Sequence, residues 1–205
     1  MAATLPPKPD FESIEAVAPK SADRRTSILA LIGNLVFSWS NNESLFIYLL
    51  MILLQTDQTS AAIVFATLNT TRARLDLIQR LAKMKIKDRA IAKQLTELID
   101  RFNKYTRIRN EFNHCMYDVS SRGEITHTHS IRIVETRTKL QLGDTRPMDD
   151  ARIKEMIEAS QGLKKLNRDI WNFLPRLQNH LNDSSALTGA SSSRANGRKG
   201  EKGNS

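Results

Sequence analysis

Apolar residues recur through the middle of the chain at spacings of three and four, which is typical of helices that bury one face. The helices that this pattern predicts cover residues 23–39, 43–55, 57–84, 88–117 and 147–181. Residues 40–42, Ser-Asn-Asn, indicate a stop followed by an N-cap. The second helix is apolar nearly all round, so we expect it at the centre. Helices with short connections pack as a bundle, and the sequence therefore predicts an all-α fold.

Helical spacing is interrupted once, before the last helix. Residues 120–123 read Ser-Ser-Arg-Gly, which is turn chemistry, and Thr and Ile alternate with their neighbours from Glu124 onward. This pattern predicts a small β-hairpin or β-arm across roughly residues 118–142. In the last helix, Pro175 is expected to kink or divide the helix, because proline lacks the backbone N–H.

The two ends of the chain differ in composition from the middle. Residues 1–22 hold four of the six prolines, which predicts an irregular lead-in. Residues 183–205 are rich in Ser, Gly and Asn and carry a positive balance, which predicts a disordered basic tail. The helical bundle is therefore expected within residues 23–182.

The net charge of +9 is concentrated in one stretch, because residues 72–93 hold eight basic and two acidic side chains. Such density favours a polyanionic partner, since neutralising phosphates releases counterions. A solvated basic helix face is the alternative. The single cysteine, Cys115, excludes an intrachain disulfide and a cysteine-rich zinc site. His127 and His129 share a face of the predicted arm, where we expect a solvent-facing pair rather than a metal site.

The longest strongly apolar run, Leu45–Leu54, has ten residues, well short of the roughly 20 that span a bilayer. No basic stretch followed by an apolar stretch opens the chain, so we expect no signal peptide, no membrane partner and a cytoplasmic location. A membrane-associated helical protein that uses the apolar run is a further alternative.

The fourth predicted helix carries a continuous stripe with steps of three and four. Its members are Ile91, Leu95, Leu98, Phe102, Tyr105, Arg109, Phe112 and Met116. An arginine within such a stripe is costly unless it is paired or faces a cleft. Either the stripe opens onto solvent at this position, or Arg109 is there for a function.

The residues around Arg109 form a motif. The segment Arg109-Asn110-Glu111-Phe112-Asn113-His114 has the pattern Arg-x4-His, with Asn directly after Arg. In this pattern, and in its place near the end of a bundle helix, the chain resembles the HEPN superfamily over about residues 24–182. The resemblance implies a homodimer and a metal-independent endoribonuclease without cofactor, of the kind found in toxin–antitoxin and defence systems. RNA and an antitoxin protein are the partners that it suggests.

The motif side chains suit that chemistry. His114 would transfer protons near neutral pH, and Arg109 would stabilise the charge that develops on the phosphate. Asn110 would orient His114 or hold a phosphate oxygen. We expect the dimer to form around Arg109 and Phe112, where two copies could share one cleft. The basic residues expected to bind RNA are Arg101, Lys104, Arg107, Arg72 and Arg74. The alternative is a HEPN-like dimer that binds RNA or protein without cleavage.

Overall fold

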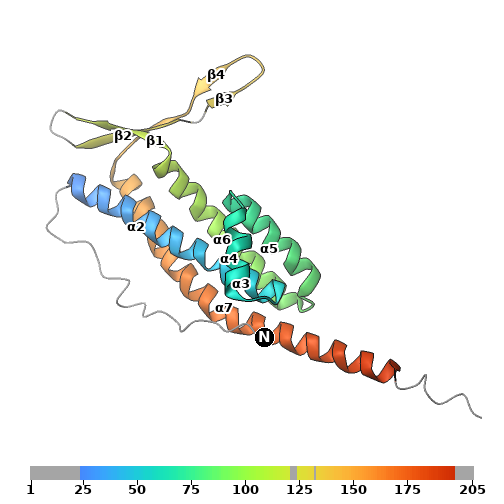
Figure 1. The fold of residues 1–205 in the computed structure, drawn as a ribbon. Coiled ribbons are helices and arrows are strands. Elements are labelled where there is room, and N and C mark those ends of the chain that lie inside the picture. Colours follow the sequence, from blue (N-terminus) through green and yellow to red (C-terminus); the bar gives the residue numbers. More distant parts are fainter. Residues whose placement is uncertain (1–23, 121–123, 132, 197–205) are drawn as a thin grey trace, which may run out of the picture. The chain divides into compact units, whose positions relative to one another are not determined.

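The computed structural model describes residues 24–120, 124–131 and 133–196. Its helices are α2 (Arg24–Ser44), α3 (Phe46–Leu54), α4 (Gln58–Thr67), α5 (Thr71–Lys85), α6 (Arg89–Asn113) and α7 (Asp150–Asn196). Its strands are β1 (Cys115–Val119), β2 (Ile125–Ser130), β3 (Ile133–Glu135), β4 (Leu140–Leu142) and β5 (Thr145–Pro147). The chain is therefore mostly helical, with a small β-arm before the last helix, as predicted (Figure 1). The predicted lead-in lies outside the described residues.

The helices belong to two compact units. One unit contains Leu45–Glu97 and the chain from Ile170 onward, and the other contains α2 and Leu98–Asp169. Both α6 and α7 therefore contribute to each unit. Fully buried side chains of the first unit include Phe46, Leu50, Leu53, Ile78 and Leu177. Those of the second include Leu35, Phe102, Met156, Leu163 and Leu166. Arg109, Asn110 and His114 all lie in the second unit.

The predicted stop at residues 40–42 is wrong, because α2 continues through it to Ser44. The side chain of Asn42 is buried, and its Nδ2 donates to the carbonyl oxygens of Ser38 at 2.8 Å and of Leu163 at 3.0 Å. An asparagine that finds such partners inside the fold does not need to cap a helix.

The predicted third helix, residues 57–84, is two helices. Asp57 caps α4 by accepting from the backbone N–H of Ser60 at 2.9 Å. The chain then becomes extended at Leu68, and the Thr70 hydroxyl accepts from the N–H of Ala73 at 3.1 Å, which starts α5. The Thr70 cap supplies the local hydrogen bond that competes with a continuous helix.

The fourth predicted helix ends earlier than expected, at Asn113 rather than near Tyr117. The Tyr117 hydroxyl and the Cys115 thiol both donate to the carbonyl oxygen of Phe112, which a longer helix would need for itself. His114 therefore follows the helix. Met116, placed on the buried stripe by its spacing, lies in β1 and is 58% exposed.

The β structure is longer than the predicted arm and consists of two small sheets. The strands β1, β2 and β5 form an antiparallel sheet in the order β1-β2-β5, and β3 pairs with β4. Strand pairing therefore begins at Cys115 and ends at Pro147 instead of running from 118 to 142. Pro147 closes β5, and Asp149 caps the last helix by accepting from the N–H of Arg152 at 2.9 Å.

The last helix, α7, is longer than predicted and continues without interruption through Pro175 to Asn196. Leu174 and Leu177 are fully buried on either side of the proline, and packing of this kind outweighs a lost backbone hydrogen bond. Residues 183–196, predicted as disordered, are helical, since an established helix gains one backbone bond for each residue added. Residues 197–205 of the predicted tail lie outside the described residues.

Candidate functional site

Trp39 explains how an arginine can occupy the buried stripe of α6. This tryptophan is 5% exposed and stacks on Phe102, with ring centroids 5.6 Å apart. Its indole N–H donates to the Thr106 hydroxyl at 2.8 Å. The Arg109 guanidinium carbon lies 3.9 Å from the centroid of the same ring system. A cation over an aromatic face keeps a favourable electrostatic interaction in a partly buried position.

The Arg109 guanidinium is only partly satisfied within the protein. One terminal nitrogen, Nη1, donates to Oδ1 of Asn110 at 2.9 Å. The Nε atom is buried and has no hydrogen-bond partner in the described part of the chain. Burial lowers the pKa of Arg109, and the nearby charge of Glu43 acts in the opposite direction. A buried N–H without an acceptor is rare, and it carries an energetic cost that the packing on Trp39 offsets in part.

His114 ends the turn that carries Arg109 and Asn110. Its backbone N–H donates to the carbonyl oxygen of Asn110 at 3.0 Å, which closes the last turn of α6. Its side chain is exposed, and no described residue makes a hydrogen bond or ion pair with its ring. The structure thus joins Arg109 to Asn110 directly and leaves the imidazole of His114 accessible to a ligand.

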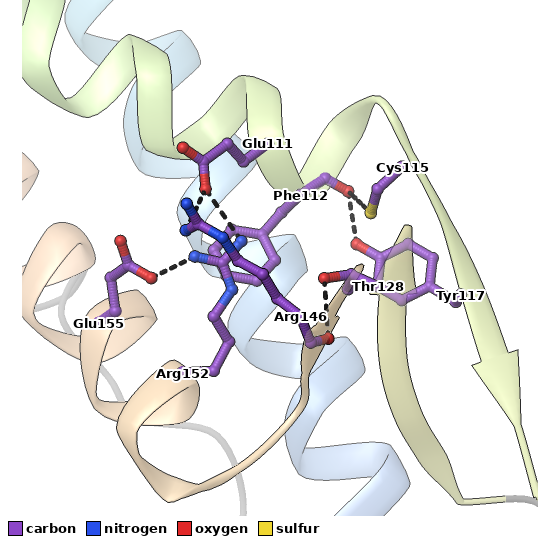
Figure 2. Close-up of polar contacts among 8 residues, drawn as sticks. All are labelled: Glu111, Phe112, Cys115, Tyr117, Thr128, Arg146, Arg152 and Glu155. Carbon is purple, nitrogen blue, oxygen red and sulfur yellow. Dashed lines mark hydrogen bonds and ion pairs between the residues drawn. The ribbon is translucent and has the colours of Figure 1, made fainter. Parts of the chain in front are cut away.

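An ion-pair network around Glu111, inside the motif, was not expected from the sequence (Figure 2). Glu111 Oε2 accepts from Arg152 at 3.0 Å and from Arg146 at 3.3 Å. The Arg152 side chain is 6% exposed, lies over the Phe112 ring at 4.2 Å and also pairs with Glu155. The end of α6 is thereby tied to β5 and to the start of α7. Nothing in the spacing of these residues indicates that they meet.

The predicted RNA-binding residues of α6 differ in their surroundings. Arg101 pairs with Asp169 at 2.6 Å, and each side chain is 33% exposed. Lys104 and Arg107 are exposed, and the ammonium of Lys104 lies 5.9 Å from the centroid of the Tyr105 ring. Lys104 and Arg107 are therefore the members of this group best placed to contact a phosphate.

The two predicted RNA-binding residues of α5 lie in the other unit. Arg74 donates through Nε to the carbonyl oxygen of Phe65 at 3.1 Å, and its guanidinium lies 4.0 Å from that residue's ring centroid. These contacts indicate a structural role for Arg74. Arg72 lies 4.0 Å from Asp76 and its side chain is 91% exposed, so it can still reach a partner. RNA binding by Arg72 and Arg74 stays a prediction.

Phe112 does not suit the dimer contact predicted from the sequence. Its side chain is 2% exposed within its own unit, and Arg152 covers its ring. A second copy that docked at this end of α6 would have to use the exposed residues Asn113 and His114 instead. The dimer itself stays a prediction.

The two histidines of the arm are not equivalent. His127 is exposed, as expected. His129 bonds through Nε2 to Asp118 Oδ2 at 2.6 Å and through Nδ1 to Thr145 Oγ1 at 2.7 Å. Across the described residues, no group of three or more His, Cys, Asp or Glu side chains could hold a metal ion.

Among the described residues, no single helix is long and apolar enough to cross a bilayer. One pair of segments in this part of the chain, 24–54 and 58–67, reaches that length and apolar composition when taken together, but the pair is bent by 118°. Comparison of the chain with protein-family models, with curated proteins and with solved structures finds no match. The resemblance to the HEPN superfamily thus depends on the motif at the end of α6 and its helical setting.

Proposed function

We propose that this protein is a metal-independent endoribonuclease of the HEPN type, with Arg109, Asn110 and His114 as its catalytic residues. The observation that carries this proposal is the chemistry of one helical turn. A half-buried guanidinium at the end of α6 is followed by an exposed imidazole. An RNA phosphate would accept from the terminal nitrogens of the guanidinium and would lie near a group that transfers protons.

The reaction that suits these groups is an internal phosphate transfer. The ribose 2′-oxygen attacks the adjacent phosphorus, the bond from phosphorus to the 5′-oxygen breaks, and a 2′,3′-cyclic phosphate and a 5′-hydroxyl result. His114 takes part in the proton transfers, and Arg109 stabilises the charge on the non-bridging oxygens. Asn110, whose Oδ1 accepts from Arg109, fixes the direction of the guanidinium. A role as a toxin or defence effector is a further part of this proposal.

The proposal is tested by cleavage of single-stranded RNA in EDTA. We expect the purified protein to leave 2′,3′-cyclic phosphate ends, and His114→Ala to slow cleavage by roughly 10²–10⁴-fold, because the variant lacks the proton-transfer group. His127→Ala is the matched control, since His127 is also an exposed histidine of the same unit. Full activity in His114→Ala, or activity that EDTA abolishes, would contradict the mechanism.

A second candidate function is RNA binding without cleavage. The observation that favours it is the packing of Arg109 on Trp39, which gives this arginine a structural use independent of catalysis. In that case the unmodified protein would bind RNA and leave it intact, and His114→Ala would bind equally well. Lys104→Glu together with Arg107→Glu would weaken binding, since both side chains are exposed cations.

A further inference from the structure

The junction between α5 and α6 carries a dense group of exposed cations. Residues 80–89 hold five basic side chains and one acidic side chain. The five basic residues, called the basic corner below, are all exposed: Arg80, Lys83, Lys85, Lys87 and Arg89. They belong to the unit that contains Leu45–Glu97, whereas the residues proposed for cleavage belong to the other unit.

The positive charge of the basic corner is not neutralised within the described part of the chain. No described residue forms a hydrogen bond or an ion pair with any of its five side chains. The one carboxylate of this stretch, Asp88, is used as a helix cap, since its Oδ1 accepts from the N–H of Ala90 at 2.7 Å and of Ile91 at 3.0 Å. Unpaired charge of one sign at such density creates a field that attracts a polyanion.

The size of the basic corner suits a nucleic-acid duplex. A helix rises about 1.5 Å per residue, and the four residues of chain from Lys85 to Arg89 reach at most about 14 Å, so the corner spans no more than about 22 Å. Double-stranded DNA carries one charge in about 1.7 Å of its axis, and a duplex of similar charge density presents about a dozen phosphates over that length. A single strand presents about half as many. A duplex therefore offers enough phosphates for all five cations.

The surroundings of the basic corner favour contacts with phosphates alone. Residues 72–93 contain no aromatic side chain on which the bases of a single strand would stack. The apolar residues Leu75, Ile78 and Ala82 are buried, and Met84, which is 67% exposed, is the one large apolar side chain exposed in this stretch. A helix that inserts into a membrane surface, or the centre of a stable protein interface, needs several exposed apolar side chains.

We infer that the basic corner binds the phosphate backbone of double-stranded RNA, an inference whose choice of RNA rests on the proposed ribonuclease function. The preferred substrate is then an RNA that has both a stem and a single-stranded segment. The basic corner binds the stem, and cleavage occurs in the single-stranded segment. Phosphate contacts carry no sequence information, so the sequence of the stem is not read.

The test measures binding of a short blunt RNA duplex by fluorescence anisotropy at several salt concentrations. This duplex has no single-stranded segment, so binding is measured separately from cleavage. Lys83→Gln, Lys85→Gln and Lys87→Gln together remove three charges from the corner. This triple variant should bind the duplex roughly 10²-fold more weakly at about 0.15 M salt, and the slope of log affinity against log salt should fall by about 3.

A matched control removes the same charge elsewhere. Lys139→Gln, Lys154→Gln and Lys165→Gln change three exposed lysines of the other unit, and together they should alter the affinity for the duplex by less than about threefold. Glutamine favours helices about as well as lysine does, so both triple variants should fold, which circular dichroism checks. If the corner triple variant does not fold, Arg80→Gln with Arg89→Gln removes two corner charges and should lower the slope by about 2.

The outcomes separate this inference from the proposed function. If no RNA is cut but the corner triple variant loses affinity for the duplex, cleavage fails as the function and the basic corner remains a binding surface. If RNA is cut but the corner and control variants bind the duplex equally well, the inference about the corner is wrong. An equally large loss of affinity for single-stranded RNA of the same length, or for phosphatidylserine vesicles, would overturn the assignment to double-stranded RNA.

Cleavage kinetics give a second measurement. On an RNA hairpin with a single-stranded loop, the corner triple variant should raise KM roughly tenfold or more with kcat unchanged, because it weakens binding without changing the reacting groups. On an RNA without a stem, its KM should equal that of the unmodified protein. A fall in kcat with unchanged KM on the hairpin would contradict a binding role.

Discussion

Replacing Arg109 with methionine would separate the charge of this side chain from its packing. The methionine chain is long and apolar, so it can still cover Trp39, but it cannot donate to Asn110 or to a phosphate. Arg109→Met should therefore abolish the proposed electrostatic role and preserve most of the fold.

The expected effect on stability is small because opposing contributions nearly cancel. Loss of the cation over Trp39 costs about 0.5–2 kcal/mol. Loss of the hydrogen bond to Asn110 costs about 0.5–1.5 kcal/mol. Removal of a buried Nε–H that lacks a partner among the described residues returns about 1–3 kcal/mol. The free energy of unfolding should consequently change by no more than about 2.5 kcal/mol in either direction.

Urea denaturation followed by circular dichroism measures this change, and cleavage of single-stranded RNA in EDTA is measured in parallel. We expect cleavage by Arg109→Met to fall by roughly 10²-fold or more, since the transition-state charge has lost its partner. Lys165→Met, at an exposed position of α7 in the same unit, controls for the loss of a positive charge. A destabilisation above about 4 kcal/mol with cleavage retained would show that Arg109 is a structural residue, and the reasoning above would be wrong.

Three further predictions concern the fold. Gly162→Ala should destabilise the protein by about 1–3 kcal/mol in urea, because an added Cβ would meet the Tyr105 hydroxyl oxygen at 2.0 Å, and Tyr105→Ala should remove the effect. Asp57→Asn should make the free energy of unfolding depend less on pH in acid. Hydrogen bonds from Ser60 hold the pKa of Asp57 below 3.8, so this side chain stabilises the unmodified protein above that pH, and the stabilisation is lost as the pH falls through the folded-state pKa. Truncation after Asn182 should leave the Tm nearly unchanged, since the sequence beyond it offers almost no large apolar side chains, and a fall of more than a few degrees would show that this segment docks.

The parts of the fold that depend on local chemistry were predictable from the sequence. Asp57 and Asp88 cap helices at the residues where the pattern predicted a helix to begin, and Asp149 caps α7 two residues after the predicted start at 147. The spacing of apolar residues also found the buried positions of α6, including Phe102 and Phe112. These signals are readable because a cap or a helical face is formed by residues a few positions apart.

The predicted helix boundaries were wrong where a contact with a residue distant in the sequence outweighed a local preference. The end of α6 depends on the Tyr117 hydroxyl, which reaches the Phe112 carbonyl only because β1 leaves the helix and pairs with β2. Likewise Asn42, which looks like a cap in the sequence, is held within α2 by the carbonyl oxygen of Leu163. Neither contact leaves a periodic signal.

By itself, the sequence determined the helical class, the arm before the last helix, and the motif in which Arg109 interrupts an apolar stripe. It did so because helical periodicity, turn residues and a charge in an apolar stripe are properties of short segments. Only the tertiary structure decided that Arg109 lies on Trp39, that Glu111 bonds to Arg152, and that His129 lies between Asp118 and Thr145. Such contacts join residues far apart in the chain, and their geometry is set by how helices and strands pack, which residue order alone does not specify.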